Sequence, residues 1–308
     1  MSFNAQILAD SFYVTPDGTA SRLTTFSVTY PRFILAEVNT HRMLSRNTAS
    51  SRAIPVKRRI TEMENDPFEF VEWGANKRGM QAGEEVEAEA IAAAKDIWAS
   101  ARKAAMTAAG CMSDLNVHKQ IANRLLEPFI WNTTIISGTD WDNFFALRTH
   151  KDAQPEFQVI ARMMKEVHDS STPDYVIPND WHLPMLTWND RVSGLSIEDQ
   201  VKVSAGKCGR VSYLTHDGKR DHSADIDLHD RMLSSGHMSA LEHPARPMTV
   251  SEWDAIDAIR REIRSFKTDD PNVIRMLAQM ELQVTYSGNY RGWIPYRKTI
   301  PGESIFRG

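Results

Sequence analysis

Cysteine is scarce in this sequence, and long apolar runs are missing. Its 308 residues include two cysteines, and neither stands in a CxxC or in a Cys/His spacing typical of a zinc site. Two cysteines also cannot build a disulfide framework. No apolar stretch approaches the roughly 18 residues of a membrane span, and the N-terminus lacks the basic and apolar segments of a secretory signal. These absences predict a cytoplasmic protein with no membrane partner.

Neither sign of charge is in large excess. Lysine and arginine number 36 against 40 aspartates and glutamates, for a net charge of −4. Such a balance gives no general attraction to a nucleic acid polymer or to an anionic membrane. The composition, 42% hydrophobic and 25% charged, is otherwise that of a soluble globular protein. Any anion must therefore be bound by a local cluster of cations, which favours a small ligand over a polymer.

Several familiar motifs are also absent. The chain has no GxGxxG and no GxxxxGK[ST], so neither a Rossmann dinucleotide site nor a P-loop is supported. Residues 209–243 contain five histidines and five aspartates, but no HExxH or HxH spacing. We interpret THDGKRDHSADID as a polar loop that leads to a helix and predict no metal site. A metal-dependent nucleotide phosphohydrolase stays open as a distant alternative.

The apolar periodicity predicts a helix-rich fold that also contains strands. A strand is expected at residues 22–30, and a second β-like segment should run from 131 to a turn at Gly138. Pro155 should start or break a helix within 143–166. Other helices are expected at 33–44, 83–109, 117–128 and from 197 onward, with a proline-rich connector at 171–196.

Residues 40–52, THRMLSRNTASSR, concentrate cations and small hydroxyl groups directly after an apolar run. Arg42, Arg46 and Arg52 offer forked donors, and nearby serines add hydroxyl groups. These groups hold phosphate through short charge-assisted hydrogen bonds. The segment therefore predicts a phosphate site, with a solvated helix end as the alternative.

Two further arginines and the two cysteines are also candidate site residues. Arg124 and Arg148 each follow apolar residues and are expected to point inward, which is costly without an anionic partner. That partner is either a ligand or a structural carboxylate. Cys208, beside an arginine, is a weak candidate for a nucleophilic thiolate, and Cys111 lies in an alanine-rich segment. Both cysteines are expected to be ordinary buried residues.

Taken together, these segments resemble the flavin-dependent thymidylate synthases. His41, Arg42 and Ser50 have the spacing of the family's arginine signature, in which Thr40 and Thr48 replace an arginine and a glutamate. NFFALRTHKDAQPE resembles a second family segment, and RVSY with GHMSALEH resembles a third. The third segment precedes the arginine signature in common members but lies near the C-terminus here. The chain therefore looks circularly permuted.

The resemblance implies an α+β fold, helix-rich with a central antiparallel sheet, in one catalytic domain over residues 1–308. Residues 1–170 would carry the arginine/serine signature and bind nucleotide, 171–196 would connect, and 197–308 would form the permuted flavin-binding part. It also implies FAD as the cofactor, with NADPH and methylenetetrahydrofolate as cosubstrates. The family assembles as a homotetramer whose active sites are shared between subunits.

Individual roles follow from the same resemblance. Arg148 would be the catalytic residue, contacting the pyrimidine ring and stabilising the negative charge that develops there. The residues expected to bind the nucleotide, mainly through its 5′-phosphate, are Ser50, Ser51, Arg52 and Arg124. The residues expected to line the flavin are His41, Arg42, Asn47, Asn143, Ser212, Ser239 and Glu242.

The implied reaction is transfer of a one-carbon unit to C5 of a pyrimidine deoxynucleotide, with dUMP to dTMP as the leading case. If water instead of hydride reached the exocyclic methylene, the product would be hydroxymethylated dUMP or dCMP. The sequence leaves uracil and cytosine open, because one arginine cannot read both ring edges. A nucleic-acid-binding protein that uses VKRRI is disfavoured by the acidic balance.

Overall fold

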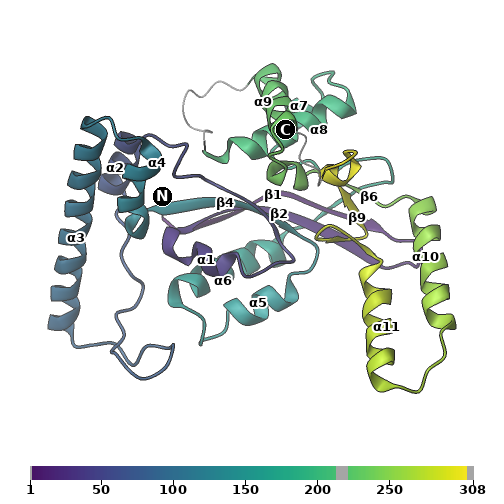
Figure 1. The fold of residues 1–308 in the computed structure, drawn as a ribbon, viewed down its shortest axis with the longest axis horizontal. Coiled ribbons are helices and arrows are strands. Elements are labelled where there is room, and N and C mark those ends of the chain that lie inside the picture. Colours follow the sequence, from purple (N-terminus) through teal and green to yellow (C-terminus); the bar gives the residue numbers. More distant parts are fainter. Residues whose placement is uncertain (1, 213–220, 304–308) are drawn as a thin grey trace.

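A five-stranded sheet forms the centre of the protein (Figure 1). The computed structural model describes residues 2–212 and 221–303. The strands are β1 (Asn4–Val14), β2 (Ala20–Pro31), β3 (Ser45–Thr48), β4 (Trp131–Gly138) and β5 (Asp174–Tyr175), in the order β3-β4-β2-β1-β5. Every pair is antiparallel except the short β1–β5 pair, so the expected α+β fold with a central antiparallel sheet is confirmed.

The first two strands form a long hairpin whose turn contains Asp17 and Gly18. Gly18 has φ +85°, a left-handed conformation that glycine adopts without a steric cost. β2 confirms the strand predicted at residues 22–30, whereas β1 was not predicted. Its pairing with β2 shifts register between Ile7 and Ala9, which interrupts the two-residue alternation that marks a strand in sequence.

Helices cover both faces of the sheet, and adjacent residues of β4 show how. Ile136 packs into one core with Phe144 and Phe157, whereas Ile135 packs into another with Cys208. The first core includes α1 (Leu35–Val38), α5 (Asp142–Arg148) and α6 (Pro155–Ser170), and η1 (Arg32–Ile34) leads into it. The second includes α8 (Ile197–Gly209) and η4 (Ser239–Glu242). Pro155 is the first residue of α6, as the sequence predicted.

Beside the second core lie η3 (Arg210–Ser212), α7 (Trp188–Arg191) and α9 (His222–Ser234). α9 begins after Asp221, whose side chain accepts a hydrogen bond from the Ser223 amide. The polar sequence before it was expected to be a loop leading to a helix. The helix start is confirmed, and residues 213–220 lie outside the described part of the structure.

A separate group of helices packs near the start of β4 (Figure 1). It contains α2 (Val56–Asn65), α3 (Ala88–Asp114), α4 (Lys119–Ala122) and the 3₁₀ helix η2 (Asn123–Phe129). α3 differs from the helix predicted at 83–109, because the Ala75–Glu84 backbone hydrogen bond and the Gly74–Glu85 bridge hold residues 83–85 outside the helix. The single helix predicted to Pro128 is wrong as well, since its second half is 3₁₀.

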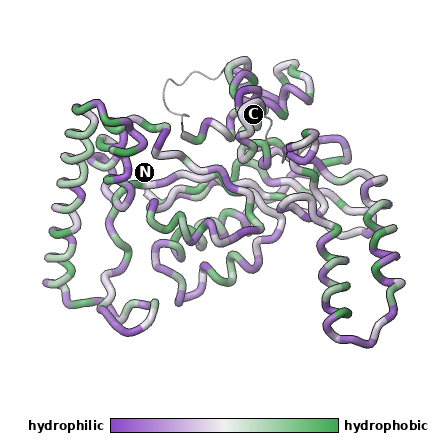
Figure 2. The backbone as a smooth tube through the Cα atoms, in the orientation of Figure 1, coloured by the Kyte–Doolittle hydropathy of each residue, from purple (hydrophilic) through white to green (hydrophobic). Residues whose placement is uncertain are grey.

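The C-terminal part adds short strands to the predicted helices. β6 (Ala245–Pro247) pairs with β9 (Trp293–Pro295), and β7 (Tyr286–Ser287) pairs with β8 (Tyr290–Arg291) before η5 (Tyr296–Thr299). α10 (Val250–Ser265) and α11 (Pro271–Gln283) form a hairpin that projects from the body, with apolar positions spaced along both helices (Figures 1 and 2). Within the described residues, none of the helices combines the length and apolar character that crossing a membrane requires.

Candidate active site

The arginine-rich segment 40–52 follows α1 and passes through a turn into β3. Arg46 does not face outward as a phosphate donor, because its Nη1 donates to the backbone carbonyls of Val38 and His41. Burial lowers the pKa of this guanidinium, although the group stays charged. Arg46 therefore closes the turn between α1 and β3, and the prediction that it belongs to the phosphate cluster is wrong.

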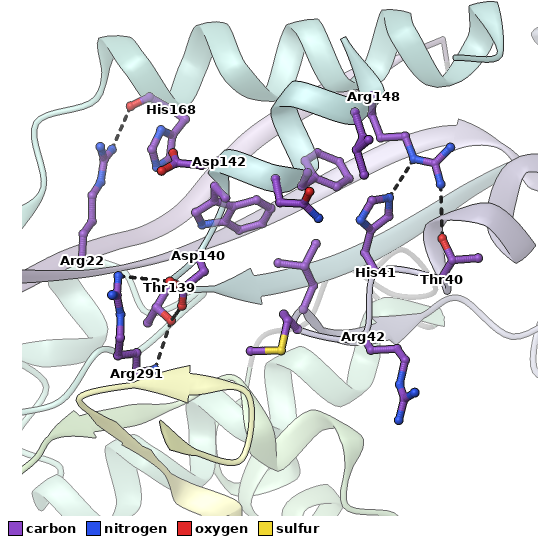
Figure 3. Close-up of a pocket in the computed structure, with 16 residues that line it drawn as sticks. Arg22, Thr40, His41, Arg42, Thr139, Asp140, Asp142, Arg148, His168 and Arg291 are labelled. Atoms are coloured by element: carbon purple, nitrogen blue, oxygen red, sulfur yellow. Dashed lines mark hydrogen bonds and ion pairs between the residues drawn. The ribbon is translucent and has the colours of Figure 1, made fainter. Parts of the chain in front are cut away.

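Arg148, at the end of α5, is fixed against this turn (Figure 3). Its Nε donates to His41 Nε2 at 2.7 Å, and its Nη2 donates to Thr40 Oγ1 at 3.2 Å. Its Nη1 lies 3.3 Å from Glu37 Oε2, and the guanidinium carbon lies 4.5 Å from the centre of the Phe157 ring. The side chain is 19% exposed. The expected inward direction of Arg148 is confirmed, and two of its partners, His41 and Thr40, come from the arginine signature.

His41 is neutral at ordinary pH. Burial, helped by the positive charges of Arg148 and Arg46, lowers its pKa to about 4. A neutral imidazole can accept at one ring nitrogen only, so the hydrogen bond received at Nε2 places the proton on Nδ1. The ring edge also contacts Phe144. His41 thus orients the guanidinium without competing with it for an anionic ligand.

A cavity of about 610 Å³ opens in front of Arg148, a size typical of small-ligand sites. Leu44, Trp141 and Phe144 supply apolar wall between two polar ends. One end holds Arg148, His41, Thr40 and Arg42, and the other holds Arg22, Thr139, Asp140, His168 and Arg291 (Figure 3). Asp140 pairs with Arg291 at 3.0 Å. Arg291, from the C-terminal part, was not singled out in the sequence.

The residues expected to line the flavin form two groups. His41, Arg42 and Asn143 line the cavity, although Arg42 extends away from Arg148 (Figure 3). The second group lies where η4 meets β3. Ser239 Oγ donates to Asn47 Oδ1 at 3.1 Å, and Asn47 Nδ2 donates to the Cys208 carbonyl at 2.7 Å.

The two remaining flavin candidates are Glu242, which lies in η4, and Ser212. Glu242 accepts a hydrogen bond from Arg297, and its backbone carbonyl accepts one from the Tyr290 hydroxyl. The side chain of Ser212 lies outside the described part of the structure. The structure therefore brings the second and third motif segments to β3 and its turn, from opposite sides of the sheet.

The residues expected to bind the phosphate gather elsewhere. Ser51 is buried, and its Oγ donates to Glu127 Oε1 at 2.7 Å. Arg124 donates to the same oxygen at 2.8 Å, with its side chain 55% exposed, so the expectation that it points inward is wrong. Arg52 is exposed, and its amide donates to Ser50 Oγ at 3.2 Å. Among the described residues that line the cavity, none comes from this group.

Glu127 was missed in the sequence, although a signal was present. It follows Arg124 by three residues, a spacing that places two side chains over each other in a 3₁₀ helix. η2 is such a helix, and the two residues form an ion pair within it. An acid at that spacing from a candidate phosphate-binding arginine could have been identified as its structural partner.

The cysteines are weak candidates for a catalytic thiolate, and the histidine-rich segment 209–243 is a weak candidate for a metal site. Cys208 is fully buried, and burial raises the pKa of its thiol, which disfavours a thiolate. Cys111 is exposed, so the prediction that both cysteines are buried holds only for Cys208. Within the described ranges, which omit His216 and Asp217, no group of three or more histidine, cysteine, aspartate or glutamate residues could hold a metal ion.

Most of β2, all of β3 and β4, the turn at residues 40–44 and α5 lie in a segment that matches a known family. Residues 22–174 match the model of the thymidylate synthase complementing protein family. Residues 22–174 therefore belong to this family, which is the flavin-dependent thymidylate synthase family that the motifs resembled.

Two solved structures are similar to parts of this chain. Both are of the UMP/dUMP methylase PolB from Streptomyces cacaoi, bound with 5-Br dUMP in one and 5-Br UMP in the other. Sequence identity is 17% and 15%, with TM-scores of 0.38 and 0.43. The matches cover 48% and 55% of this chain, which spans 65% of the first structure, less than two thirds, and 89% of the second. A search of curated proteins finds no match.

Proposed function

We propose that this protein transfers a one-carbon unit to C5 of a pyrimidine deoxynucleotide, with dUMP to dTMP as the leading reaction. The observation that carries the proposal is Arg148, which enters the cavity from α5 and is oriented by His41 and Thr40 of the arginine signature. This arrangement joins the first two motif segments of the family at one cavity. In this reading, the chain acts as one catalytic unit from residue 1 to residue 308.

Arg148 would polarise the pyrimidine. C5 of the ring is a poor nucleophile, and the buried thiol of Cys208 cannot form the adduct that would activate it. A guanidinium at the ring edge stabilises negative charge as it develops on the ring, and it does so best when its direction is fixed beforehand. His41 accepts from Nε at 2.7 Å, while Glu37 and Thr40 face the two terminal nitrogens, so the direction of the guanidinium is fixed. Each terminal nitrogen carries two N–H groups, so one on each would remain for a ring acceptor.

The cavity wall fits a flat, partly polar ring system such as the flavin of FAD. Arg42 and Asn143 supply polar groups at the wall, and Trp141 and Phe144 supply flat apolar surface. The volume of about 610 Å³ is sufficient for a ring of that size. When bound, the flavin would supply hydride and carry the one-carbon unit, drawing on NADPH and methylenetetrahydrofolate. The chain's own residues would orient the rings and limit the access of water.

A homotetramer with shared active sites accounts for the separation of the two predicted groups. Arg148 lies at the cavity, whereas Ser51 and Arg124 meet at η2 and are absent from its described lining. A nucleotide could contact both groups if a second copy presented its phosphate-binding residues to the cavity. Contacts of β3 with Cys208 and Ser239 support the permuted order, because they return the C-terminal motif segment to the arginine signature.

Hydroxymethylation of dUMP or dCMP is the alternative, and Thr40 is the observation that favours it. The family has an arginine at this position, whereas Thr40 places a small hydroxyl group on the cavity wall beside Arg148. A hydroxyl group can hold a water molecule at hydrogen-bond distance. Water near the reacting carbon would divert the product from methyl to hydroxymethyl.

The test combines a visible spectrum with product analysis. The purified protein is incubated with dUMP or dCMP, methylenetetrahydrofolate, FAD and NADPH, and the nucleotides are weighed by mass spectrometry. Flavin absorbance with a methyl gain on dUMP supports the leading reaction, and a hydroxymethyl gain on either nucleotide supports the alternative. A colourless protein that leaves both nucleotides unchanged contradicts the proposal.

A further inference from the structure

Glu127 already occupies the donors that are proposed to bind the nucleotide phosphate. Its Oε1 accepts from Ser51 Oγ at 2.7 Å and from Arg124 Nη1 at 2.8 Å. A third donor, Arg32 Nη2, lies 3.6 Å from the same oxygen. One hydroxyl group and two guanidinium groups thus converge on a single anionic oxygen. This is the environment that a phosphate oxygen would need.

A phosphate and the Glu127 carboxylate cannot share these donors. An oxygen bound by both Ser51 and Arg124 must lie within about 3 Å of each donor atom, which is where Oε1 lies now. Two oxygen atoms cannot occupy that position, and two anionic groups at such close range repel each other. The carboxylate must therefore leave before a phosphate binds in this way.

Arg32 provides a second partner for the displaced carboxylate. Its Nη1 donates to the Ala49 carbonyl at 3.0 Å and to Asn132 Oδ1 at 2.7 Å, so its position is set independently of Glu127. The Arg32 side chain is 15% exposed, and its Nη2 lies just beyond hydrogen-bond distance of Oε1. A small rotation of the Glu127 side chain would replace the bonds to Ser51 and Arg124 with one to Arg32.

We propose that Glu127 is an internal competitor of the nucleotide 5′-phosphate and thereby sets the affinity of the site. It holds Ser51 and Arg124 before the nucleotide arrives and pairs with Arg32 when the phosphate takes its place. This inference rests on the proposed function, because it takes Ser51 and Arg124 as phosphate ligands. The competition weakens nucleotide binding, which favours release of the product.

Substitution of Glu127 by glutamine tests the competition directly. Glu127→Gln keeps the shape and an acceptor oxygen but removes the charge, so the dissociation constants for dUMP and dCMP should fall about tenfold in titration calorimetry. Inorganic phosphate, a second probe, should bind more tightly as well. Glu62→Gln is the matched control, since the Glu62 side chain is about as exposed as that of Glu127 but pairs with Arg58 and Arg59. The Glu62→Gln variant should bind the nucleotides with the affinity of the unaltered protein.

Arg32→Gln supplies a second measurement. With Glu127 present, loss of Arg32 should weaken nucleotide binding, because the displaced carboxylate has no second partner. With Glu127→Gln in the same chain, loss of Arg32 should change the affinity little. Melting temperatures identify any variant that fails to fold, and the comparison of Glu127→Gln with Glu62→Gln stands without Arg32→Gln.

The possible outcomes separate this inference from the function on which it rests. If the unaltered protein binds a pyrimidine nucleotide and Glu127→Gln binds it no more tightly, Glu127 only positions Arg124. The competitor role is then overturned, while the proposed function stands. If the folded, unaltered protein binds neither nucleotide nor inorganic phosphate, the proposed phosphate site is wrong and the competitor role fails with it.

Discussion

Three nitrogens of Arg148 face three residues of one short segment. Nε contacts His41, Nη1 faces Glu37 and Nη2 contacts Thr40. The forked, planar group makes these contacts possible at once, and a lysine ammonium has no equivalent fork. The resemblance to the family predicted that His41 and Arg148 share a site. It did not indicate Glu37, because that contact depends on how α1 packs against α5.

Replacement of Arg148 by lysine should therefore impair turnover more than binding. Arg148→Lys keeps the positive charge but loses the fixed direction of the donors, so kcat should fall by about 10²-fold or more. Flavin absorbance should be retained, because the wall residues Arg42, Asn143 and Trp141 are unchanged. Steady-state kinetics and the visible spectrum measure the two effects separately.

Arg162→Lys is the control for this substitution. Arg162 lies in the neighbouring helix α6 and donates to Gln158, away from the cavity lining. Its replacement should leave kcat within about twofold. If Arg148→Lys turns over at the unaltered rate, the proposed catalytic role of Arg148 is wrong.

Protonation of the buried histidines should make the fold sensitive to acid. Burial lowers the pKa of His41 to about 4, and the pKa values of His182 and His243 to about 3. A histidine in the unfolded chain has a pKa near 6.5. Below that pH the unfolded chain binds protons at these histidines, whereas the buried histidines of the folded chain stay neutral. Stability should be full above about pH 6.5 and should fall as the pH drops toward 4. Thermal melts across this range measure it.

His41→Asn isolates one of these histidines. Asparagine can accept a hydrogen bond from Arg148 but does not titrate, so the loss of stability between pH 6.5 and 4 should become shallower. His150→Asn is the control, because His150 is exposed. Equal slopes for His41→Asn and the unaltered protein would show that His41 does not stay neutral in the fold.

At the scale of elements, local pattern predicted β2, β4 and the start of α6, because each has regular periodicity or a marker such as Pro155. Two of the misses, β1 and the start of the helix predicted at 83–109, share one physical cause: pairing with a distant segment overrides the local sequence pattern. The register shift after Ile7 obscures β1, and the Gly74–Glu85 bridge removes Gly83 from the predicted helix. Such pairings join segments whose contact cannot be read from local periodicity.

The packing of α8 on α9 gives a prediction at this scale. A Cβ atom added to Gly206 would lie 2.2 Å from the Asp225 carbonyl oxygen, a clash with backbone that no rotamer relieves. Gly206→Ala should therefore destabilise the protein by about 1–3 kcal/mol. It should also weaken flavin binding, because the end of α8 contacts Asn47. Thermal melts and flavin titration measure the two effects.

Gly110→Ala is the matched control within a helix. A Cβ there would meet only Ile60, at 3.9 Å. Inside a helix, alanine is also more stable than glycine by about 1 kcal/mol. This variant should be as stable as the unaltered protein or more so. If Gly206→Ala melts at the unaltered temperature, the close approach of α8 to α9 is not needed for stability.

Across the whole molecule, motif residues from both halves meet at the sheet, but they divide among three places: the cavity, the contact of η4 with β3, and η2. The resemblance predicted which residues belong to one active site, including Arg148, Ser51 and Arg52. Their placement on one chain could not be predicted, because it depends on packing. The hairpin of α10 and α11 lies beyond the segment 22–174 that matches the family, and the sequence motifs assign it no role.

Complementation between two inactive variants tests whether subunits share active sites. Arg148→Ala removes a cavity residue and Arg52→Ala removes a phosphate-binding residue, so each variant alone should lose most of its activity. In a co-expressed mixture, an active site that takes Arg148 from one subunit and Arg52 from another is intact in about a quarter of cases. Activity should therefore return to about a quarter of the unaltered value. A mixture as inactive as the separate variants would mean that each chain completes its own site, and the nucleotide would then have to reach from the cavity to η2 within one subunit.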